Sequence, residues 1–554
     1  MNRYLNKLQS VPPADQLSAL VMAGMGLVIV LTFRDYGLGW DEPFHEHYGT
    51  LIWDFISSGG VDQRVNTFRN LKSYGGLYDG LGALLAKAVP MEPFHTHHLL
   101  NAATGLLGAA GVWAMARAMS NPWAGFWALV VLLAIPTYTG HIFINPKDIP
   151  FAVGTIWTLY FAMRTFSALA KGDLRAARGL GVALGATRGV RIGGGVWVVY
   201  LLVLLALHVM WKQGRARDAV GIKAISLAVL VVATVSFVLT FALWPSAWPN
   251  LMANALAALS NTAQFKFDID VLLHGEWVNA RHLPPDYLPS YLVVKLPEMV
   301  LALFVLSLPL TAWGLVQALV NGDRERAFGY VALVLGVFFP VAFSLAVKSM
   351  HYDALRHFLF VLPPMAVLVG VGLGDVLGDA LNGLRQRYAV VAGVTVMAGL
   401  AFPVVQMVAL HPYAYTYYNR TAGGVQGAEG QYELDYWATS YREAAEWLRG
   451  APVVPVTGPV LVYVCGPTDS AARFLPSRFE VVKDVHDADF FIAFSRWNCD
   501  ALVEAPTLYT VERQGARLAA VKDLRDYFIV LGEMPNNIRI NEDYPRRSEE
   551  HTSQ

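Results

Sequence analysis

A series of long apolar stretches limits the fold of this chain more than any other feature of the sequence. Apolar stretches of roughly 20 residues, the length that crosses the hydrocarbon core of a bilayer as a helix, follow one another along most of its length. We distinguish about eleven of them. They lie near 16–36, 97–118, 122–140, 149–170, 177–190, 194–211, 222–243, 291–320, 327–347, 355–378 and 388–410. The pattern predicts a polytopic α-helical membrane protein with about 11 transmembrane helices.

Composition agrees with this class and excludes others. Hydrophobic residues make up 55% of the 554-residue chain and charged residues only 15%, whereas soluble domains carry about 25% charged residues. Basic and acidic residues number 42 each, so the net charge is zero and a nucleic-acid partner is not expected. We therefore expect membrane lipids around residues 1–410.

The orientation of the chain in the membrane can be predicted from its short loops, because loops rich in lysine and arginine stay in the cytoplasm. An N-terminus on the inside places four basic clusters there: Arg164/Lys171/Arg175/Arg178, Lys212/Arg215/Arg217/Lys223, Arg324/Arg326 and Arg385/Arg387. Two long loops, 37–96 and 244–290, then lie outside, as does everything after residue 410. For a bacterial chain, this is the periplasmic side of the inner (plasma) membrane.

The segment after residue 410 is richer in charge and differs from the rest. Strand-like runs begin at Pro459, Phe479 and Asp489, and Ser440 with Glu443 forms a capping-box pattern that predicts a helix over 441–449. We expect a small extracytoplasmic α/β domain over 411–540 and a disordered tail over 541–554. Cys465 and Cys499 are either one disulfide or two separate buried thiols.

Acidic residues mark two places next to predicted spans on the outer side. Asp41 and Glu42 directly follow the first span, at a depth where a carboxylate loses solvation and gains basicity as a general base. An ordinary polar loop explains the same pair. Asp148 stands where it would cap the next helix, with Pro150 in the first turn, and Lys147 beside it is suited to meet an anion.

Basic residues are embedded near span ends on the same predicted side. They are Arg188 and Arg191 in a glycine-rich turn, and Lys348 and Arg356 before the tenth span. Arginine is costly in lipid unless it reaches the interface or finds a partner. Acids and arginines gathered on one side suit a phosphate-bearing lipid headgroup together with a base that activates an acceptor.

Metal binding is the weakest prediction. His45, His47 and His141 offer ligand types, and a divalent metal is one interpretation of them, but the tight His-Glu-x-x-His spacing is absent. Surface or core histidines explain the same residues. No credible nucleotide-binding or serine-hydrolase motif accompanies them.

Several of these segments resemble a known family when taken in order. They are the Asp41–Glu42 pair, the Asn-Pro-Lys-Asp loop ending at Asp148, the run LWPSAWP at 243–249, LPPDYLP at 283–289, RHFLFVLPP at 356–364, HPYAYTYYNRTAGGVQGA from 411 and DYWATSYREAAEWL from 435. Together they resemble GT-C membrane glycosyltransferases. The likeness is greatest to the bacterial relatives of dolichyl-phosphate-mannose protein mannosyltransferases (glycosyltransferase family 39), over most of residues 30–450.

The resemblance implies an inverting enzyme that moves a hexosyl or pentosyl group from a polyprenyl-phosphate-linked donor to a hydroxyl of a lipid, glycan or protein acceptor. By position, Asp41 would be the general base, Glu42 its neighbour in substrate binding, and Asp148 a second acid of the site. Arg356 would neutralise the departing lipid phosphate, with Arg188, Arg191 and Lys348 as helpers.

Two other classes of protein fit part of the pattern. A transporter or flippase of lipid-linked sugars would also use external arginines, but it should carry polar residues at mid-span depth on both halves of its path. A scaffold with an outer binding domain would have no need of Asp41. The concentration of ionisable residues on one side favours the enzyme.

Overall fold

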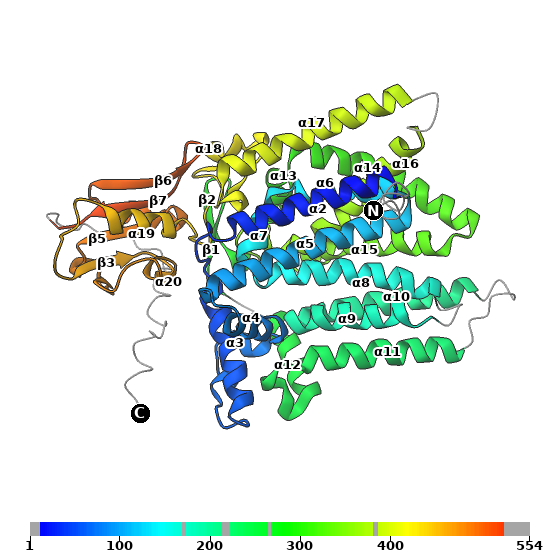
Figure 1. Cartoon of the computed structure of the whole chain (residues 1–554), viewed down its shortest axis with the longest axis horizontal. Coiled ribbons are helices and arrows are strands. Elements are labelled where there is room, and N and C mark those ends of the chain that lie inside the picture. Colours follow the sequence, from blue (N-terminus) through cyan, green and yellow to red (C-terminus); the bar gives the residue numbers. More distant parts are fainter. Residues whose placement is uncertain (1–10, 169–172, 213–221, 264–266, 381–385, 526–554) are drawn as a thin grey trace, which may run out of the picture.

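The computed structural model describes residues 11–168, 173–212, 222–263, 267–380 and 386–525. Long helices run side by side and form most of the molecule, and a small sheet domain lies beyond one end of them (Figure 1). The helices of this bundle are α2 (Pro13–Thr32), α5 (Pro93–Met119), α6 (Pro122–Leu133), α7 (Pro136–Ile144), α8 (Asp148–Ala168), α9 (Arg175–Val190), α10 (Val196–Lys212), α11 (Ile222–Phe241), α14 (Glu298–Asn321), α15 (Arg324–Ala346), α16 (Leu362–Ala380) and α17 (Gln386–Leu410).

The predicted class, a polytopic helical membrane protein, is confirmed. Each of the eleven apolar stretches is helical, and among the described residues seven helices are long and apolar enough to cross a membrane. The pair α6 and α7 adds an eighth if its two parts, bent by 69°, form one span. The predicted stretches near 149–170, 177–190 and 194–211 form α8, α9 and α10, which do not meet the same length and apolarity limits.

Proline breaks two of the predicted stretches. Pro136 begins α7, and Ile135 before it is extended, as the steric clash of a proline ring with the preceding residue requires. In the same way Pro297 separates α13 (Tyr287–Lys295) from α14, so the span expected from residue 291 begins at Glu298. Both breaks lie at the end of the bundle that faces the sheet domain (Figure 1).

The two long loops fold against that same end of the bundle (Figure 1). Loop 37–96 forms α3 (Glu42–Ser57) and α4 (Leu77–Ala88), with short 3-10 turns η1 (Arg64–Asn66) and η2 (Asn70–Ser73) between them. Loop 244–290 forms η6 (Pro245–Asn250), α12 (Leu251–Ala263), the antiparallel pair β1 (Asp270–Leu273) and β2 (Glu276–Asn279), η7 (Ala280–His282) and the start of α13. The single turn η4 (Ile192–Gly195) joins α9 to α10, and η8 (Arg356–Val361) leads into α16.

The C-terminal segment contains the expected small α/β unit. Its sheet has the order β4-β3-β5-β7-β6, with β3 parallel to β4 and β5 and with β7 antiparallel to β5 and β6. The elements are η9 (Ala414–Thr416), η10 (Arg420–Ala422), α18 (Gly424–Ala428), α19 (Tyr441–Gly450), β3 (Val460–Val464), α20 (Thr468–Ala472), β4 (Phe479–Val481), η11 (Val485–Asp487), β5 (Phe490–Phe494), η12 (Arg496–Ala501), β6 (Thr507–Arg513) and β7 (Ala516–Asp523). A disulfide joins Cys465 to Cys499. The predicted tail, 541–554, lies outside the described residues.

The helix predicted from the capping box is present as α19, but the cap is not. Ser440 makes no side-chain bond to the helix N-terminus. Glu443 instead binds Arg513 at 2.7 Å and accepts hydrogen bonds from the hydroxyls of Tyr413 and Tyr509, both at 2.9 Å. Glu443 therefore binds residues distant in the sequence rather than the N-terminus of its own helix.

Close helix packing in the bundle depends on small residues. A Cβ added to Gly370 of α16 would lie 2.4 Å from the Cβ of Ala128 in α6, and one added to Gly374 would lie 2.5 Å from the Cβ of Ala124. Glycine thus lets the two backbones approach, as small residues do in membrane helix pairs.

We predict that Gly370→Ala lowers stability by about 1–3 kcal/mol, because α6 must move to accept the methyl group. Gly393→Ala in α17 is the matched control, since the nearest atom to its added Cβ, in Trp127, is 3.6 Å away. Thermal unfolding in detergent measures both. An equal melting temperature for the two variants would contradict the packing argument.

Candidate active site

A cavity of about 180 Å³ lies where the end of the bundle, the two loops and the C-terminal domain meet. Its walls combine charged and aromatic side chains, the mixture expected of a pocket that binds a polar ligand. The lining residues are Trp40, Asp41, Phe44, His45, Arg69, Asn70, Leu71, Tyr74, Lys147, Phe267, Ile269, Tyr352, Asp353, Arg356, Trp437, Arg496 and Trp497. They come from segments up to several hundred residues apart.

Asp41 lies on the cavity wall, immediately before the first residue of α3. Its Oδ2 is 2.9 Å from Nη1 of Arg356 and 3.1 Å from Nζ of Lys147. Burial raises the pKa of the Asp41 carboxyl, but the charges of Lys147 and Arg356 more than offset this and hold that pKa well below its usual range. Asp41 is therefore ionised at neutral pH.

Arg356 occupies the centre of the site. Its side chain is 2% exposed, and it contacts three carboxylates: Asp41, Asp353 (Nε to Oδ2, 2.8 Å) and Asp148 (Nη1 to Oδ2, 3.7 Å). The guanidinium also lies over the ring of Trp437, 5.2 Å from its centroid. Asp353 and Ala354 have left-handed backbones, with φ of 60° and 55°. These two residues form a tight bend just before η8, and the Asp353 carboxylate contacts Arg356 three residues later.

Asp148 begins α8 and takes part in the same network. Arg191 Nη1 lies 2.7 Å from its Oδ1. The predicted capping role belongs to Asn145, whose Oδ1 accepts hydrogen bonds from the backbone N–H groups of Lys147 and Asp148. The Asp148 carboxylate is thus free of the helix end and holds arginines. It does not line the cavity.

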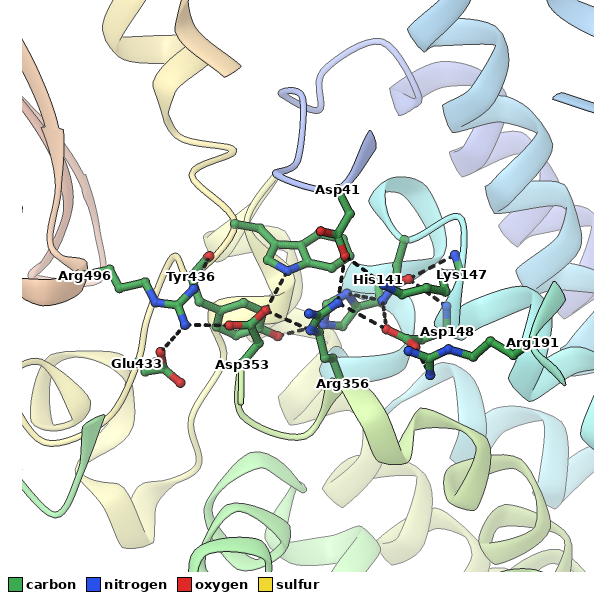
Figure 2. Close-up of polar contacts among 12 residues, drawn as sticks. Asp41, His141, Lys147, Asp148, Arg191, Asp353, Arg356, Glu433, Tyr436 and Arg496 are labelled. Carbon is green, nitrogen blue, oxygen red and sulfur yellow. Dashed lines mark hydrogen bonds and ion pairs between the residues drawn. The ribbon is translucent and has the colours of Figure 1, made fainter. Parts of the chain in front are cut away.

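Oppositely charged groups alternate along the site in one continuous row. From one end, Glu433 pairs with Arg496, Arg496 with Asp353, Asp353 with Arg356, Arg356 with Asp148, and Asp148 with Arg191 (Figure 2). Asp41 and Lys147 branch from the row at Arg356. Burial raises the pKa of the Glu433 carboxyl, against the charge of Arg496.

Glu42 has a different environment from its neighbour. Its side chain is buried, with Oε1 2.9 Å from Nε2 of His98 and Oε2 accepting the backbone N–H of Gly39 at 2.6 Å. Burial raises the pKa of Glu42, and the His98 pairing opposes this. Glu42 does not line the cavity, and it holds the turn that carries Asp41.

Two of the predicted basic helpers lie apart from the cavity. Arg188 in α9 points to Ser236, with Nη1 and Oγ 3.4 Å apart. Lys348 is exposed in the turn after α15. Neither of them lines the cavity. Of the other two predicted phosphate-binding residues, Arg356 lines the cavity, whereas Arg191 does not line it and instead binds Asp148.

The histidines are engaged with other side chains. Nδ1 of His45 is 2.9 Å from Oδ1 of Asp79, Nε2 of His141 is 2.8 Å from the Tyr436 hydroxyl, and His47 packs against Phe68. Among the described residues, no group of three or more His, Cys, Asp or Glu side chains is arranged to hold a metal ion.

Sequence reasoning did not identify Asp353, Glu433, Arg496 and Trp497 as parts of the site. Asp353 lies between Lys348 and Arg356, the two residues before the tenth span that were predicted to bind phosphate, and Arg496 and Trp497 lie in a domain to which no role was assigned. The one sequence signal near Arg496 and Trp497 is Cys499, because a disulfide at that residue would hold the backbone of its neighbours in place. Lys147 was noted for anion binding, but not as a partner of Asp41.

The chain matches two solved proteins over most of its length. ArnT from Cupriavidus metallidurans in the apo state matches 91% of this chain and 97% of its own length, at 15% identity and a TM-score of 0.46, and its undecaprenyl phosphate-bound structure matches at 16% and 0.46. The Archaeoglobus fulgidus oligosaccharyltransferase matches 85% of this chain at 12% identity and a TM-score of 0.48. This chain spans 65% of that longer protein.

No protein-family model and no curated protein matches the sequence. The function of this chain is therefore argued from its own residues.

We predict that Arg356→Gln lowers stability by about 3–5 kcal/mol, because it leaves buried carboxylates without their common partner. Arg64→Gln is the control: Arg64 also contacts two carboxylates, those of Asp54 and Asp62, but its side chain is 51% exposed. The cost there should stay below about 1 kcal/mol. Thermal unfolding of both variants measures the difference, and similar melting temperatures would show that the Arg356 network adds no stability.

Proposed function

We propose that this protein is an inverting GT-C-type glycosyltransferase that takes a sugar from a polyprenyl-phosphate-linked donor. One observation carries the proposal: a carboxylate, Asp41, shares its oxygen between Arg356 and Lys147 on the wall of a cavity at the end of a membrane-spanning bundle. A base and a cationic phosphate site are the two components that this reaction needs from a protein.

The charge of the cavity suits a lipid phosphate. Four basic side chains line it, Arg69, Lys147, Arg356 and Arg496, against the two acids Asp41 and Asp353. Such an excess of positive charge would attract a phosphate group. As the bond between the anomeric carbon and the phosphate oxygen breaks, Arg356 and Lys147 would neutralise the charge that collects on the polyprenyl phosphate.

Asp41 would act as the base. The acceptor hydroxyl gives its proton to the carboxylate while its oxygen forms the new bond to the anomeric carbon, on the face opposite the phosphate. An arriving phosphate competes with Asp41 for Arg356 and Lys147. Weakening those two ion pairs raises the basicity of Asp41 when donor is present. Glu42 would serve this reaction by fixing the turn before α3, and Asp148 by holding Arg356 and Arg191.

The position of the basic loops supports an outward-facing site. α8 is 21 residues long and begins at Asp148, so Arg164 near its last turn lies about 25 Å from Asp148. Arg324, at the start of α15, belongs to another of the predicted cytoplasmic clusters. We infer that the cavity and the C-terminal domain face the extracytoplasmic side, the periplasm of a bacterial inner membrane, where lipid, glycan or protein acceptors present hydroxyls.

Turnover of a panel of radiolabelled undecaprenyl-phosphate sugars by purified protein tests the proposal. Transfer or donor hydrolysis by the wild type, with a loss of at least a hundredfold in Asp41→Asn and donor binding retained, is the expected result. Lys348→Met, which changes an exposed charge outside the cavity, should match the wild type. Equal turnover by Asp41→Asn would remove Asp41 as the base. Binding without turnover under any acceptor would favour the transporter.

The pH profile of kcat/KM provides a second prediction. The base must be ionised, and Lys147 helps to hold its pKa low. Protonation of Asp41 should therefore not slow the wild type between pH 8 and about pH 5, whereas Lys147→Met should raise this pKa and move the acid limb of the profile to higher pH. The phosphodiester of the donor stays singly charged over that range. Coincident acid limbs would contradict the role of Lys147.

A further inference from the structure

One histidine on the cavity wall has an acidic partner behind it. His45 of α3 lines the cavity, and its Nδ1 lies 2.9 Å from Oδ1 of Asp79 in α4. Both side chains are buried, and Asp79 does not line the cavity. An ionised carboxylate only accepts hydrogen bonds, so Nδ1 must carry the proton that it shares with Asp79. Neutral His45 therefore has the lone pair of its ring on Nε2.

Nε2 is the atom of His45 that remains available to a ligand. Within the described part of the chain it makes no hydrogen bond, and it is not one of the nitrogens that lie shut off from solvent without a partner. A reachable ring nitrogen, on an imidazole that a carboxylate orients from the other side, is the arrangement of a general base.

The packing of α4 against α3 fixes this pair. Gly49 lies one turn after His45, and a Cβ added to it would overlap the backbone carbonyl of Asp79. Glycine therefore allows the two helices to approach closely at this point. One turn further along, Nε1 of Trp53 donates to the backbone carbonyl of Gly80 at 2.7 Å. α4 is thus held against α3 directly beside the bond between His45 and Asp79.

Asp41 lies one helical turn before His45. The backbone N–H of His45 donates to the carbonyl of Asp41 at 3.3 Å, and residues four apart in a helix lie on the same face. Both ion pairs of Asp41 use Oδ2, which leaves Oδ1 for the acceptor hydroxyl. The two side chains are close enough that a proton on His45 would lower the pKa of Asp41. A proton that moves from Asp41 to His45 therefore favours the return of Asp41 to its ionised form.

Asp41 by itself accepts a proton weakly, because two cations hold its pKa well below the usual range. Histidine side chains are in general stronger bases than aspartate side chains. Other titratable groups near His45 are Glu42 on its own helix and His97 of α5. Glu42 is paired with His98, and neither Glu42 nor His97 lines the cavity. His45 is thus better placed than these groups to take a proton from Asp41.

We propose that the His45–Asp79 pair takes up the proton that the reaction releases. The inference rests on the proposed function and adds the residue on which that proton ends. His45 would touch the reacting groups from the cavity wall, and Asp79 would act as a positioning residue that keeps the lone pair of the ring on Nε2.

The proton and the electron pairs balance in this step. The acceptor oxygen forms its bond to the anomeric carbon, and the bond from that carbon to the phosphate oxygen breaks, with its electron pair left on the polyprenyl phosphate. The hydroxyl proton passes to Asp41 and from there to Nε2 of His45. Asp79 stabilises the resulting imidazolium, whose charge adds to the positive charge of the cavity as the phosphate departs. The proton then leaves to water before the next turnover.

Turnover of a radiolabelled undecaprenyl-phosphate sugar by the full-length protein in detergent tests this. The lipid used is the one that the wild type turns over fastest, and the release of labelled sugar is followed with water as the acceptor. The variants are His45→Ala and Asp79→Asn. His47→Ala is the matched control, since His47 lies on the same helix but packs against Phe68 and does not line the cavity. Each protein is assayed with and without added imidazole, and titration calorimetry gives its Kd for undecaprenyl phosphate.

We expect His45→Ala to lower kcat about a hundredfold, with a Kd for undecaprenyl phosphate within about twofold of the wild type. Added imidazole should raise the rate of this variant about tenfold, because the shortened side chain leaves room for the ring. Asp79→Asn should also lower kcat, since its amide can donate to Nδ1 and so move the ring proton to Nε2. His47→Ala should match the wild type, and Asp41→Asn should gain nothing from imidazole.

Other results would overturn the inference in distinct ways. Turnover by His45→Ala equal to that of the wild type would remove His45 from the reaction and leave Asp41 as the base. A loss that imidazole does not restore, or one matched by weaker binding of undecaprenyl phosphate, would assign His45 a structural role. An unchanged kcat in Asp79→Asn would remove Asp79 as the positioning residue. Failure of the wild type to bind or turn over any polyprenyl-phosphate sugar would overturn the proposed function as well.

Discussion

The site depends on the burial of one guanidinium. A charged arginine with 2% exposure is unfavourable unless carboxylates surround it, and Arg356 has three of them. Each carboxylate comes from a different part of the chain: the turn before α3, the start of α8, and the bend before η8. Satisfying Arg356 therefore fixes the relative positions of the first loop and of two bundle helices. The residues that we assign to chemistry are held by the same contacts.

The remaining partners of Asp353 extend this effect to the C-terminal domain. Asp353 binds Arg356 with one oxygen and Arg496 with the other, and it accepts a hydrogen bond from the indole of Trp437. Asp353 therefore joins the linker before α19 and the C-terminal domain to Arg356 of the bundle, beside other contacts such as that of Tyr436 with His141. Apolar residues of the bundle, the linker and the sheet domain also pack in one continuous core, so the buried ion pairs add to an apolar contact between the two parts.

Much of the fold could be predicted from the sequence, because periodic apolar stretches and basic loops report directly on a membrane. The gathering of Asp41, Asp148, Arg191 and Arg356 at one end of the bundle was also predictable, since each follows or precedes a recognisable span. Their pairings were not, because which carboxylate meets which arginine is decided by tertiary contact. The same limit applies to the cap of α8. The position of Asp148 predicts that it caps this helix, but Asn145 accepts the hydrogen bonds from the backbone N–H groups at the helix start.

The cavity wall that contains Trp497 has a consequence for biogenesis. Ribosomes make the chain from its N-terminus, so the bundle helices are synthesised and inserted before residue 497 exists. The cavity therefore lacks the wall formed by Arg496 and Trp497 until the final domain has been made and has folded. A chain interrupted before that point would contain Arg356, Lys147 and Asp41 but would lack this wall of the pocket. A complete cavity thus requires a chain that has been made at least as far as residue 497 and has folded.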